Sequence, residues 1–256
     1  PGGAPLLAHA PACFPPSTLG AAQAPWLALL ETGALPPHDP QSLPGAWMVQ
    51  PEWEALLEAS IQAGRSQDWA ALLHLGVMRL EALDEPGAEA AWQESLRRQP
   101  SAWAYRNLAV LAQRQGQPER TLALYEQAWD LAGQMQAPPP ALAVEYLRLV
   151  AAAGQMRRGL EIYQALPPEV QAIDRVQLLR GQFALALDDL DAVEEVLARP
   201  YAEIREGETT LTDLWFELHA RREAARSGRA PDDALRAEVR RRFPPPAAID
   251  FRSFND

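Results

Sequence analysis

The side chains most often used for metal binding and acid–base chemistry are few in this chain of 256 residues and form no known arrangement. The histidines are His9, His38, His74 and His219. None has a Cys, His or carboxylate partner at a metal-ligand spacing, so we expect no metal and no cofactor. His74 stands beside Gly76 in an apolar helical segment, which indicates a packed or groove-lining histidine rather than a catalytic one.

Nucleophiles and paired acids are equally scarce. Cys13, the one cysteine, stands in a Pro-rich tract rather than at a helix start that would activate its thiolate. No Gly-rich phosphate loop, dinucleotide fingerprint or nucleophile elbow is present. The acidic run at 188–195 is typical of a solvated helix face, and the sequence does not place two carboxylates across a cleft. We therefore predict that the chain is not an enzyme.

Charge and hydropathy narrow the possible partners. The formal net charge is −11, which argues against nucleic-acid binding because that requires Lys and Arg along a phosphate track. The basic clusters near the C-terminus are expected to form solvated helix ends. No apolar run approaches the roughly 18 residues of a membrane span. A single cysteine allows no intramolecular disulfide, which fits a cytoplasmic protein. From charge, hydropathy and cysteine content together, we expect a soluble, cytoplasmic protein without membrane or nucleic-acid partners.

The elements that must position any site come from a pattern that returns about every 33 residues between Asp68 and Leu166. Each copy carries small and large apolar residues at helical spacing, divided between two short helices. In the first copy, at 69–102, the landmarks are Leu72, Leu75, Gly76, Ala88, Trp92, Ser95 and Pro100. In the second, from about 102, they are Tyr105, Leu108, Ala109, Gly116, Thr121, Tyr125 and Ala128. In the third, from about 140, they are Ala143, Tyr146, Leu147, Gly154, Gly159, Tyr163 and Leu166.

This pattern resembles the tetratricopeptide repeat (TPR), a unit of about 34 residues. The resemblance implies an all-α fold, an α-solenoid of antiparallel helix hairpins in a TPR-like superhelix, in which each hairpin covers the apolar face of its neighbour. Small residues such as Gly76, Ala88, Ala109 and Gly159 let the paired helices approach. Trp92, Tyr125 and Tyr163 fill the space beside them, so these residues are expected to be scaffold.

The remaining elements extend this scaffold at both ends. Residues 1–50 are rich in Pro and Gly and are predicted to be a wrap or linker, with one two-turn helix at 25–30. A helix at 51–63 should cover the first repeat, and a further pair is expected, its first helix running from Val170 to Phe183. A longer helix from Thr210, with Asp213 at capping-box spacing, should reach 226. The predicted domains are 1–50, 51–226 for the helical repeats with their capping helices, and 227–256 for a last helix and an extended strap.

The TPR resemblance also implies where a ligand binds, because the first helix of each hairpin lines the concave face. The outward residues there are Trp103, Arg106, Asn107, Val110, Gln113, Val144, Glu145 and Arg148. Arg106 and Arg148 could hold a carboxylate by forked hydrogen bonds, with Trp103 as an apolar wall. Alternatively, Trp103 packs between repeats and the arginines pair with local Glu. The family's peptide clamp uses Lys and Asn where this chain has Leu73 and Val77, so a chaperone-tail ligand is not expected.

The C-terminal segments 205–216 and 249–252 carry a second resemblance, to large bacterial proteins that join a β-rich, sugar-enzyme-like front half to a helical-repeat back half. The chain begins Pro-Gly-Gly without an initiator Met, as a fragment of a longer protein would. The tail 244–254 would then be a strap that packs Ile249, Phe251 and Phe254 on its own repeats or on the front half. The alternative is a plain end cap.

The favoured function is a non-enzymatic interaction scaffold that binds a peptide or a partner domain in its concave groove, possibly an upstream domain of the same polypeptide. The alternative is an accessory helical module of a multidomain carbohydrate-active enzyme whose catalytic domain lies upstream. A free-standing hydrolase is the third hypothesis. The presence of several hundred residues ahead of Pro1 would favour the accessory module over the free scaffold, and their absence would favour the scaffold.

Overall fold

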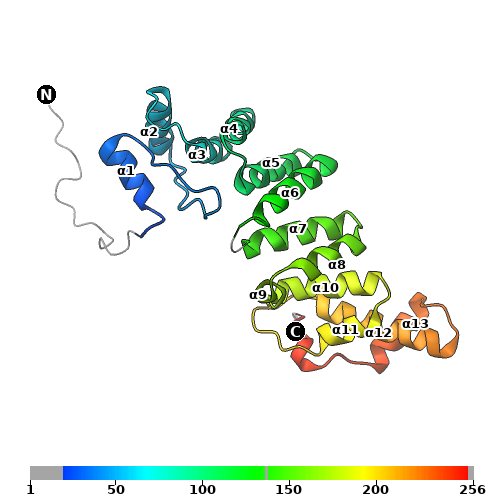
Figure 1. Cartoon of the computed structure of the whole chain (residues 1–256). Helices are drawn as coiled ribbons and strands as arrows, with labels where there is room; N and C mark the ends of the chain where they lie inside the picture. Colours follow the sequence, from blue (N-terminus) through cyan, green and yellow to red (C-terminus); the bar gives the residue numbers. More distant parts are fainter. Residues whose placement is uncertain (1–19, 136–137, 253–256) are drawn as a thin grey trace. The chain divides into compact units, whose positions relative to one another are not determined.

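The computed structural model describes residues 20–135 and 138–252. These residues form thirteen α-helices and no strand, which confirms the prediction of an all-α protein for the described part of the chain (Figure 1). His9, Cys13 and Phe254 lie outside the described residues. By their contacts the residues divide into two compact units, unit 1 (Pro1–Ala137) and unit 2 (Pro138–Asp256), which are described separately. In the described ranges no helix is both long and apolar enough to cross a bilayer.

The described part of unit 1 contains six helices, and short connections join all of them except α1 and α2, which residues 33–50 link. Their bounds are α1 (Ala24–Thr32), α2 (Pro51–Gln62), α3 (Trp69–Glu81), α4 (Glu85–Arg98), α5 (Ala102–Arg114) and α6 (Pro118–Ala132). The two N-terminal helices confirm the sequence predictions at 25–30 and 51–63. Asp68, Asp84 and Ser101 start α3, α4 and α5 as N-caps, and each side chain accepts a hydrogen bond from an otherwise unpaired backbone N–H.

Helices α3 and α4 meet where a glycine faces an indole. A Cβ on Gly76 would stand 2.7 Å from Cε2 of Trp92 and closer still to its Nε1. The Trp92 side chain is 1% exposed, and its Nε1 donates to the Leu73 carbonyl oxygen at 3.1 Å. The Ser95 hydroxyl donates to the Trp69 carbonyl oxygen at 2.9 Å. The small residue of the sequence pattern therefore makes room for the large one on the facing helix.

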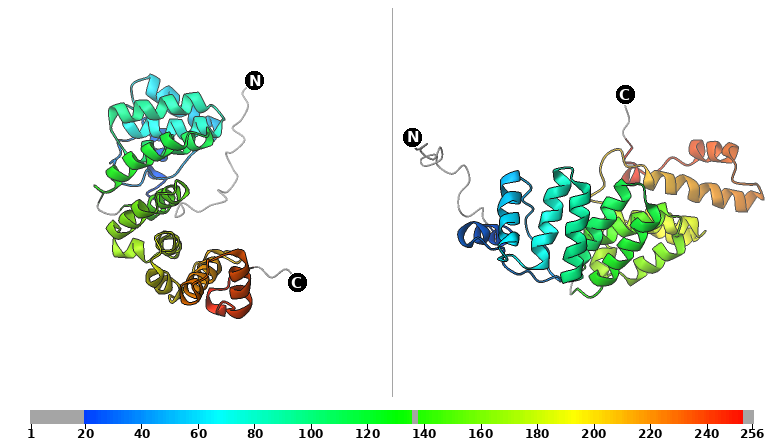
Figure 2. Two further views of the ribbon diagram at one scale, coloured as in Figure 1. Left: turned by 90° about the vertical axis from the view of Figure 1, so that its right-hand side faces the viewer. Right: turned by 90° about the horizontal axis from the view of Figure 1, so that it is seen from above.

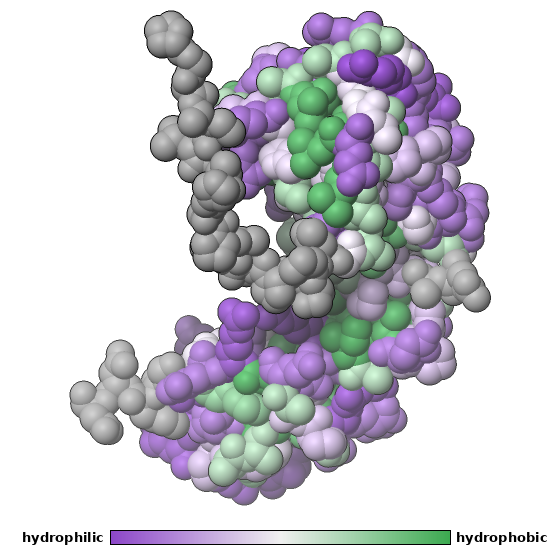
Figure 3. Space-filling view, turned by 90° about the vertical axis from the view of Figure 1, so that its left-hand side faces the viewer, coloured by the Kyte–Doolittle hydropathy of each residue, from purple (hydrophilic) through white to green (hydrophobic). Residues whose placement is uncertain are grey.

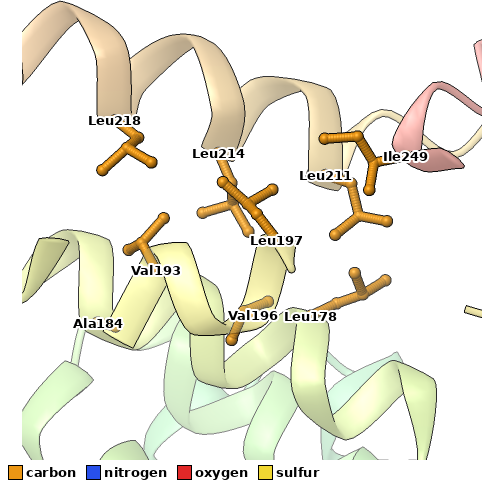
Figure 4. Close-up of a cluster of buried hydrophobic side chains, with 9 residues drawn as sticks. All are labelled: Leu178, Ala184, Val193, Val196, Leu197, Leu211, Leu214, Leu218 and Ile249. Carbon is orange, nitrogen blue, oxygen red and sulfur yellow. The ribbon is translucent and has the colours of Figure 1, made fainter. Parts of the chain in front are cut away.

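Unit 2 contains seven helices and a short 3-10 helix. Their bounds are α7 (Pro140–Ala152), α8 (Met156–Ala165), α9 (Pro168–Gln171), α10 (Asp174–Ala186), α11 (Leu190–Leu197), α12 (Thr210–Ser227), α13 (Asp233–Arg242) and η2 (Ala247–Ile249). The leucines of α12 point onto α10 and α11, and Ile249 lies beside Leu211 at one end of the cluster (Figure 4). Phe251 packs against the same cluster. Among the predicted alternatives, the tail therefore packs on the chain's own helices through Ile249 and Phe251.

Two sequence predictions for unit 2 are wrong. A single helix from Val170 to Phe183 was expected, but α9 ends at Gln171 and α10 begins at Asp174, with Gln177 Nε2 donating to the Gln171 carbonyl oxygen at 2.6 Å. A small residue lies at the interface of α10 with α12, because a Cβ on Gly181 would lie 2.6 Å from Leu214 Cδ1 of α12.

The start of α12 also differs from the expected capping box of Thr210 and Asp213. The N-cap is Thr209, whose hydroxyl donates to Asp213 Oδ2 at 3.0 Å. Glu208 Oε1 instead accepts from the backbone N–H of Thr210 at 2.9 Å and from its hydroxyl at 2.6 Å. A carboxylate two residues ahead of the helix is therefore the acceptor for an N–H of its first turn.

Four connections between consecutive helices share one backbone feature. In each, the residue two positions after the first helix has positive φ: Leu83 (64°), Gly116 (68°), Gly154 (71°) and Asp188 (62°). Glycine adopts this left-handed conformation without the steric cost that other residues carry. Leu83 is 84% exposed and gains no burial in return.

We expect Leu83→Gly to raise the free energy of unfolding of unit 1 by about 0.5 kcal/mol, because relief of about 1 kcal/mol of strain is partly offset by the greater freedom of glycine in the unfolded chain. Gly116→Leu is the matched reverse change, since no atom lies within 4 Å of a Cβ there. It should destabilise by a similar or larger amount in urea titrations. A loss of stability in Leu83→Gly would contradict this account.

Candidate functional site

The predicted site residues divide between the two units. Trp103, Arg106, Asn107 and Gln113 lie on α5 in unit 1, and Arg148 lies on α7 in unit 2. Gln113 and Arg148 are exposed, whereas Trp103 and Arg106 are half-buried. Arg106 Nη1 donates to Asn107 Oδ1 at 3.4 Å. Asn107 is 7% exposed, and its buried Nδ2 has no hydrogen-bond partner among the described residues.

Trp103 contacts the chain's own N-terminal segment. Its Nε1 donates to the Ser42 carbonyl oxygen at 3.0 Å, while its ring packs against the core shared by α3, α4 and α5. Residues 34–49, which we call the N-terminal segment, contain no helix and pass along unit 1 between α1 and α2 (Figure 2). This stretch therefore lies against Trp103, where the sequence analysis placed a ligand.

Two more tryptophans hold the N-terminal segment by its backbone. Trp69, the first residue of α3, donates from Nε1 to the His38 carbonyl oxygen at 2.9 Å. Trp26 of α1 donates in the same way to the Ala46 carbonyl oxygen at 2.8 Å. Together with Trp103, three indole N–H groups thus bind three carbonyl oxygens spaced along the N-terminal segment, which makes a hydrogen-bonded turn between Asp39 and Ser42.

His74 of α3 lies under the far end of this segment. Its ring packs edge-on against Trp26 and Trp47, with centroids 4.9 Å and 5.0 Å away. It is 4% exposed, and burial, followed by the nearby charge of His38, lowers its pKa to about 4. His74 is therefore a packed histidine, one of the two roles that the sequence indicated.

Some large apolar side chains in the described part of unit 1 remain exposed. The large exposed hydrophobic side chains of unit 1 are Leu30, Leu43, Trp47 and Leu83. Patches of hydrophobic surface interrupt the hydrophilic surface on the face shown in Figure 3. Two of these four residues, Leu43 and Trp47, belong to the N-terminal segment itself.

In unit 2, Arg148 lines a cavity of about 170 Å³. We call it the arginine pocket, since Arg148 of α7, Arg175 of α10 and Arg205 of the loop before α12 line it together. The remaining lining residues are Leu178, Leu179, Gln182, Glu203, Ile204, Glu208 and Thr210. Hydrogen bonds from Thr210 lower the pKa of the Glu208 carboxyl, and the positive charge of Arg148 adds to this shift.

Sequence reasoning missed Arg175 and Arg205 as partners of Arg148, because nothing in their spacing shows that three separate elements converge. It also missed the N-terminal segment as an occupant of unit 1. A signal existed for the segment, since tryptophans stand at the starts of both α3 and α5.

Within the described ranges, no three His, Cys, Asp or Glu side chains gather in a group that could hold a metal ion. No protein-family model matches the chain, and no curated protein is significantly similar to it. The geometry of the two units is therefore the basis for a functional proposal.

Proposed function

We propose that the chain is a non-enzymatic protein-interaction scaffold of stacked, TPR-like helix hairpins, and that unit 1 binds a non-helical polypeptide segment through its backbone carbonyls. The recurring left-handed connection supports the repeat, because α3–α4, α5–α6, α7–α8 and α10–α11 are each joined by three residues with positive φ at the middle one. The packing of Gly76 under Trp92 supports it further, since this is the role that small and large residues take in such hairpins.

The observation that carries the proposal is the way unit 1 holds the N-terminal segment. Trp69 and Trp103 donate to carbonyl oxygens of residues 38 and 42. A backbone carbonyl is common to every residue, so these bonds fix the path of the bound chain without reading its side chains. Unit 1 therefore has the donors that a peptide-binding face needs, and its own N-terminal segment is the occupant in this structure.

Asn107 adds a donor that is still unused. Its Nδ2 is buried without a partner among the described residues, and a buried donor left unpaired costs about 1–3 kcal/mol. A water, an ion or a ligand can supply the missing acceptor of such a group. Asn107 lies one turn of α5 beyond Trp103, so a peptide carbonyl at this helix would satisfy it once the side chains that cover Nδ2 move aside.

The test asks whether unit 1 binds an added peptide after its own N-terminal segment has been replaced. In the full chain, residues 36–47 are replaced by a Gly-Ser linker of equal length, and a labelled peptide of sequence 34–49 is added. We expect saturable binding by fluorescence anisotropy. Replacing Trp69 and Trp103 by Phe in this linker variant keeps an aromatic ring at each position and removes two donors, so affinity should fall about thirtyfold, at about 1 kcal/mol per hydrogen bond.

The control peptide has the same sequence built from D-amino acids, which preserves hydrophobicity and inverts the handedness of the backbone. Circular dichroism establishes that each variant is folded. A folded linker variant that binds neither peptide, or binds both equally, would refute the proposal. An unchanged affinity after the two Trp→Phe substitutions would show that the indole donors do not hold the ligand.

A further inference from the structure

The three cations of the arginine pocket are unpaired. The guanidinium groups of Arg148, Arg175 and Arg205 make no hydrogen bond or ion pair with any described residue. Several other arginines of unit 2 are paired: Arg180 with Glu195, Arg222 with Glu194, Arg236 with Glu217 and Arg252 with Asp250. Guanidinium groups that make no ion pair around one cavity, in a chain of net charge −11, provide the donors that an anion requires.

The loop that carries Arg205 is fixed from both sides. The backbone N–H groups of Ala202 and Glu203 donate to Asp174 Oδ2 at 2.9 and 2.8 Å. On the other side, the Gly207 N–H donates to the Phe251 carbonyl oxygen at 2.5 Å. The backbone under Arg205 is therefore held against α10 and the C-terminal tail before any ligand binds, which reduces the entropy lost on binding.

The charge of the pocket selects the kind of anion. With three guanidinium groups and the carboxylates of Glu203 and Glu208, the lining carries a formal net charge of +1. Glu208 is ionised at neutral pH, since Thr210 and Arg148 lower its pKa. One negative charge balances this sum, whereas a phosphate dianion would exceed it. A carboxylate matches both the charge and the forked geometry of Arg.

The size and the apolar lining limit the rest of the ligand. The cavity of about 170 Å³ equals the volume of about six water molecules, at about 30 Å³ each. Drug-sized ligands and nucleotides occupy about 300–1,000 Å³. Leu178, Leu179 and Ile204 offer apolar contact beside the arginines. A short aliphatic chain attached to the carboxylate fits this lining.

We infer that the arginine pocket of unit 2 is a binding site for a small aliphatic monocarboxylate. Arg148, Arg175 and Arg205 bind its carboxylate, and Leu178, Leu179 and Ile204 contact its hydrocarbon part. This site is separate from the tryptophan face of unit 1 and stands whether or not that face binds peptides.

The experiment follows the arginine Nε–H signals of the full chain, labelled with ¹⁵N-arginine, in NMR titrations. The probes are 4-methylpentanoate, its uncharged amide, inorganic phosphate and N-acetyl-leucine. We expect 4-methylpentanoate to shift the signals of Arg148, Arg175 and Arg205 and to bind at least about tenfold more tightly than the amide. Tighter binding of phosphate would overturn the monocarboxylate assignment. Tighter binding of N-acetyl-leucine would make the pocket the end of a peptide site and overturn the small-ligand assignment.

Matched variants assign the binding to the pocket. Arg175→Gln and Arg205→Gln each remove one guanidinium that makes no bond in the described structure, so the melting temperature should stay the same while affinity falls about tenfold. Arg241→Gln is the control, because Arg241 is exposed on α13 and does not line the pocket. Equal binding of acid and amide, no binding of the acid, or equal loss in Arg241→Gln would overturn the assignment.

Discussion

Replacing Gly76 with alanine is expected to lower the free energy of unfolding of unit 1 by about 3 kcal/mol, the upper part of the usual range for overpacking. The new methyl group would overlap the Trp92 indole, which is 1% exposed and held by its bond to the Leu73 carbonyl oxygen. The ring cannot turn aside without losing that bond. Urea titration followed by tryptophan fluorescence measures the effect, because seven of the eight tryptophans belong to unit 1.

A double-mutant cycle identifies the cause. Trp92→Leu is destabilising by itself, but it empties the space that the methyl group of Gly76→Ala would enter. In that background Gly76→Ala should cost nothing, or stabilise by up to about 1 kcal/mol through its better helix propensity. Gly133→Ala is the control, since its φ of −63° is ordinary and the nearest atoms to a Cβ are 3.6 Å away. If Gly76→Ala costs the same with and without Trp92, the collision is not the reason.

The second large effect is the pH dependence of unit 1. His74 has a folded-state pKa of about 4, against 6.5 for an exposed histidine. Between these values the unfolded chain binds more protons than the folded one, so stability increases with pH across this window. The full contribution is present above pH 6.5 and is lost as the pH falls towards 4. At about 1.4 kcal/mol per pH unit, the loss amounts to about 3 kcal/mol.

His74→Leu isolates this contribution. The variant has its own stability, but the difference between its free energy of unfolding and that of the wild type should change by about 3 kcal/mol between pH 7 and pH 4. His38 is the charged group whose field reaches His74, so the same titration in His38→Gln measures its share. Burial also lowers the pKa of His219 in unit 2, and His219→Leu serves as the control outside unit 1. Parallel pH profiles for wild type and His74→Leu would exclude His74 as the source.

The helices were predictable because their signals are local. Apolar spacing, a proline at the first turn and an N-cap residue act within a few positions, as at Pro51 of α2 and Asp68 of α3. The packing of Gly76 against Trp92 was predictable for a related reason. A small and a large residue recur at these two positions in the pattern that returns about every 33 residues. The break between α9 and α10 was not, because Val170 and Val176 keep helical spacing across it.

The candidate sites depend on distant contacts and were only partly predictable. Trp103 was identified as a wall for a ligand, yet its partner, the Ser42 carbonyl oxygen, comes from a segment that looked like a linker. Every residue has a backbone carbonyl, so the residue types do not show which carbonyl accepts a hydrogen bond. Arg148 was identified alone, because its neighbours Arg175 and Arg205 reach the same cavity from another helix and a loop. The TPR-like repeat, the scaffold function and the carbohydrate-enzyme alternative stay predictions.

The left-handed connections are also suitable insertion points for a label or a folded tag. At Gly116 and Gly154 no atom lies within 4 Å of where a Cβ would stand. Lengthening a surface connection costs little, since closing a loop of twice the length takes only about 0.6 kcal/mol more. Each unit thus offers one point, between α5 and α6 or between α7 and α8, where a fluorophore or a small folded tag can be inserted without entering a helix interface.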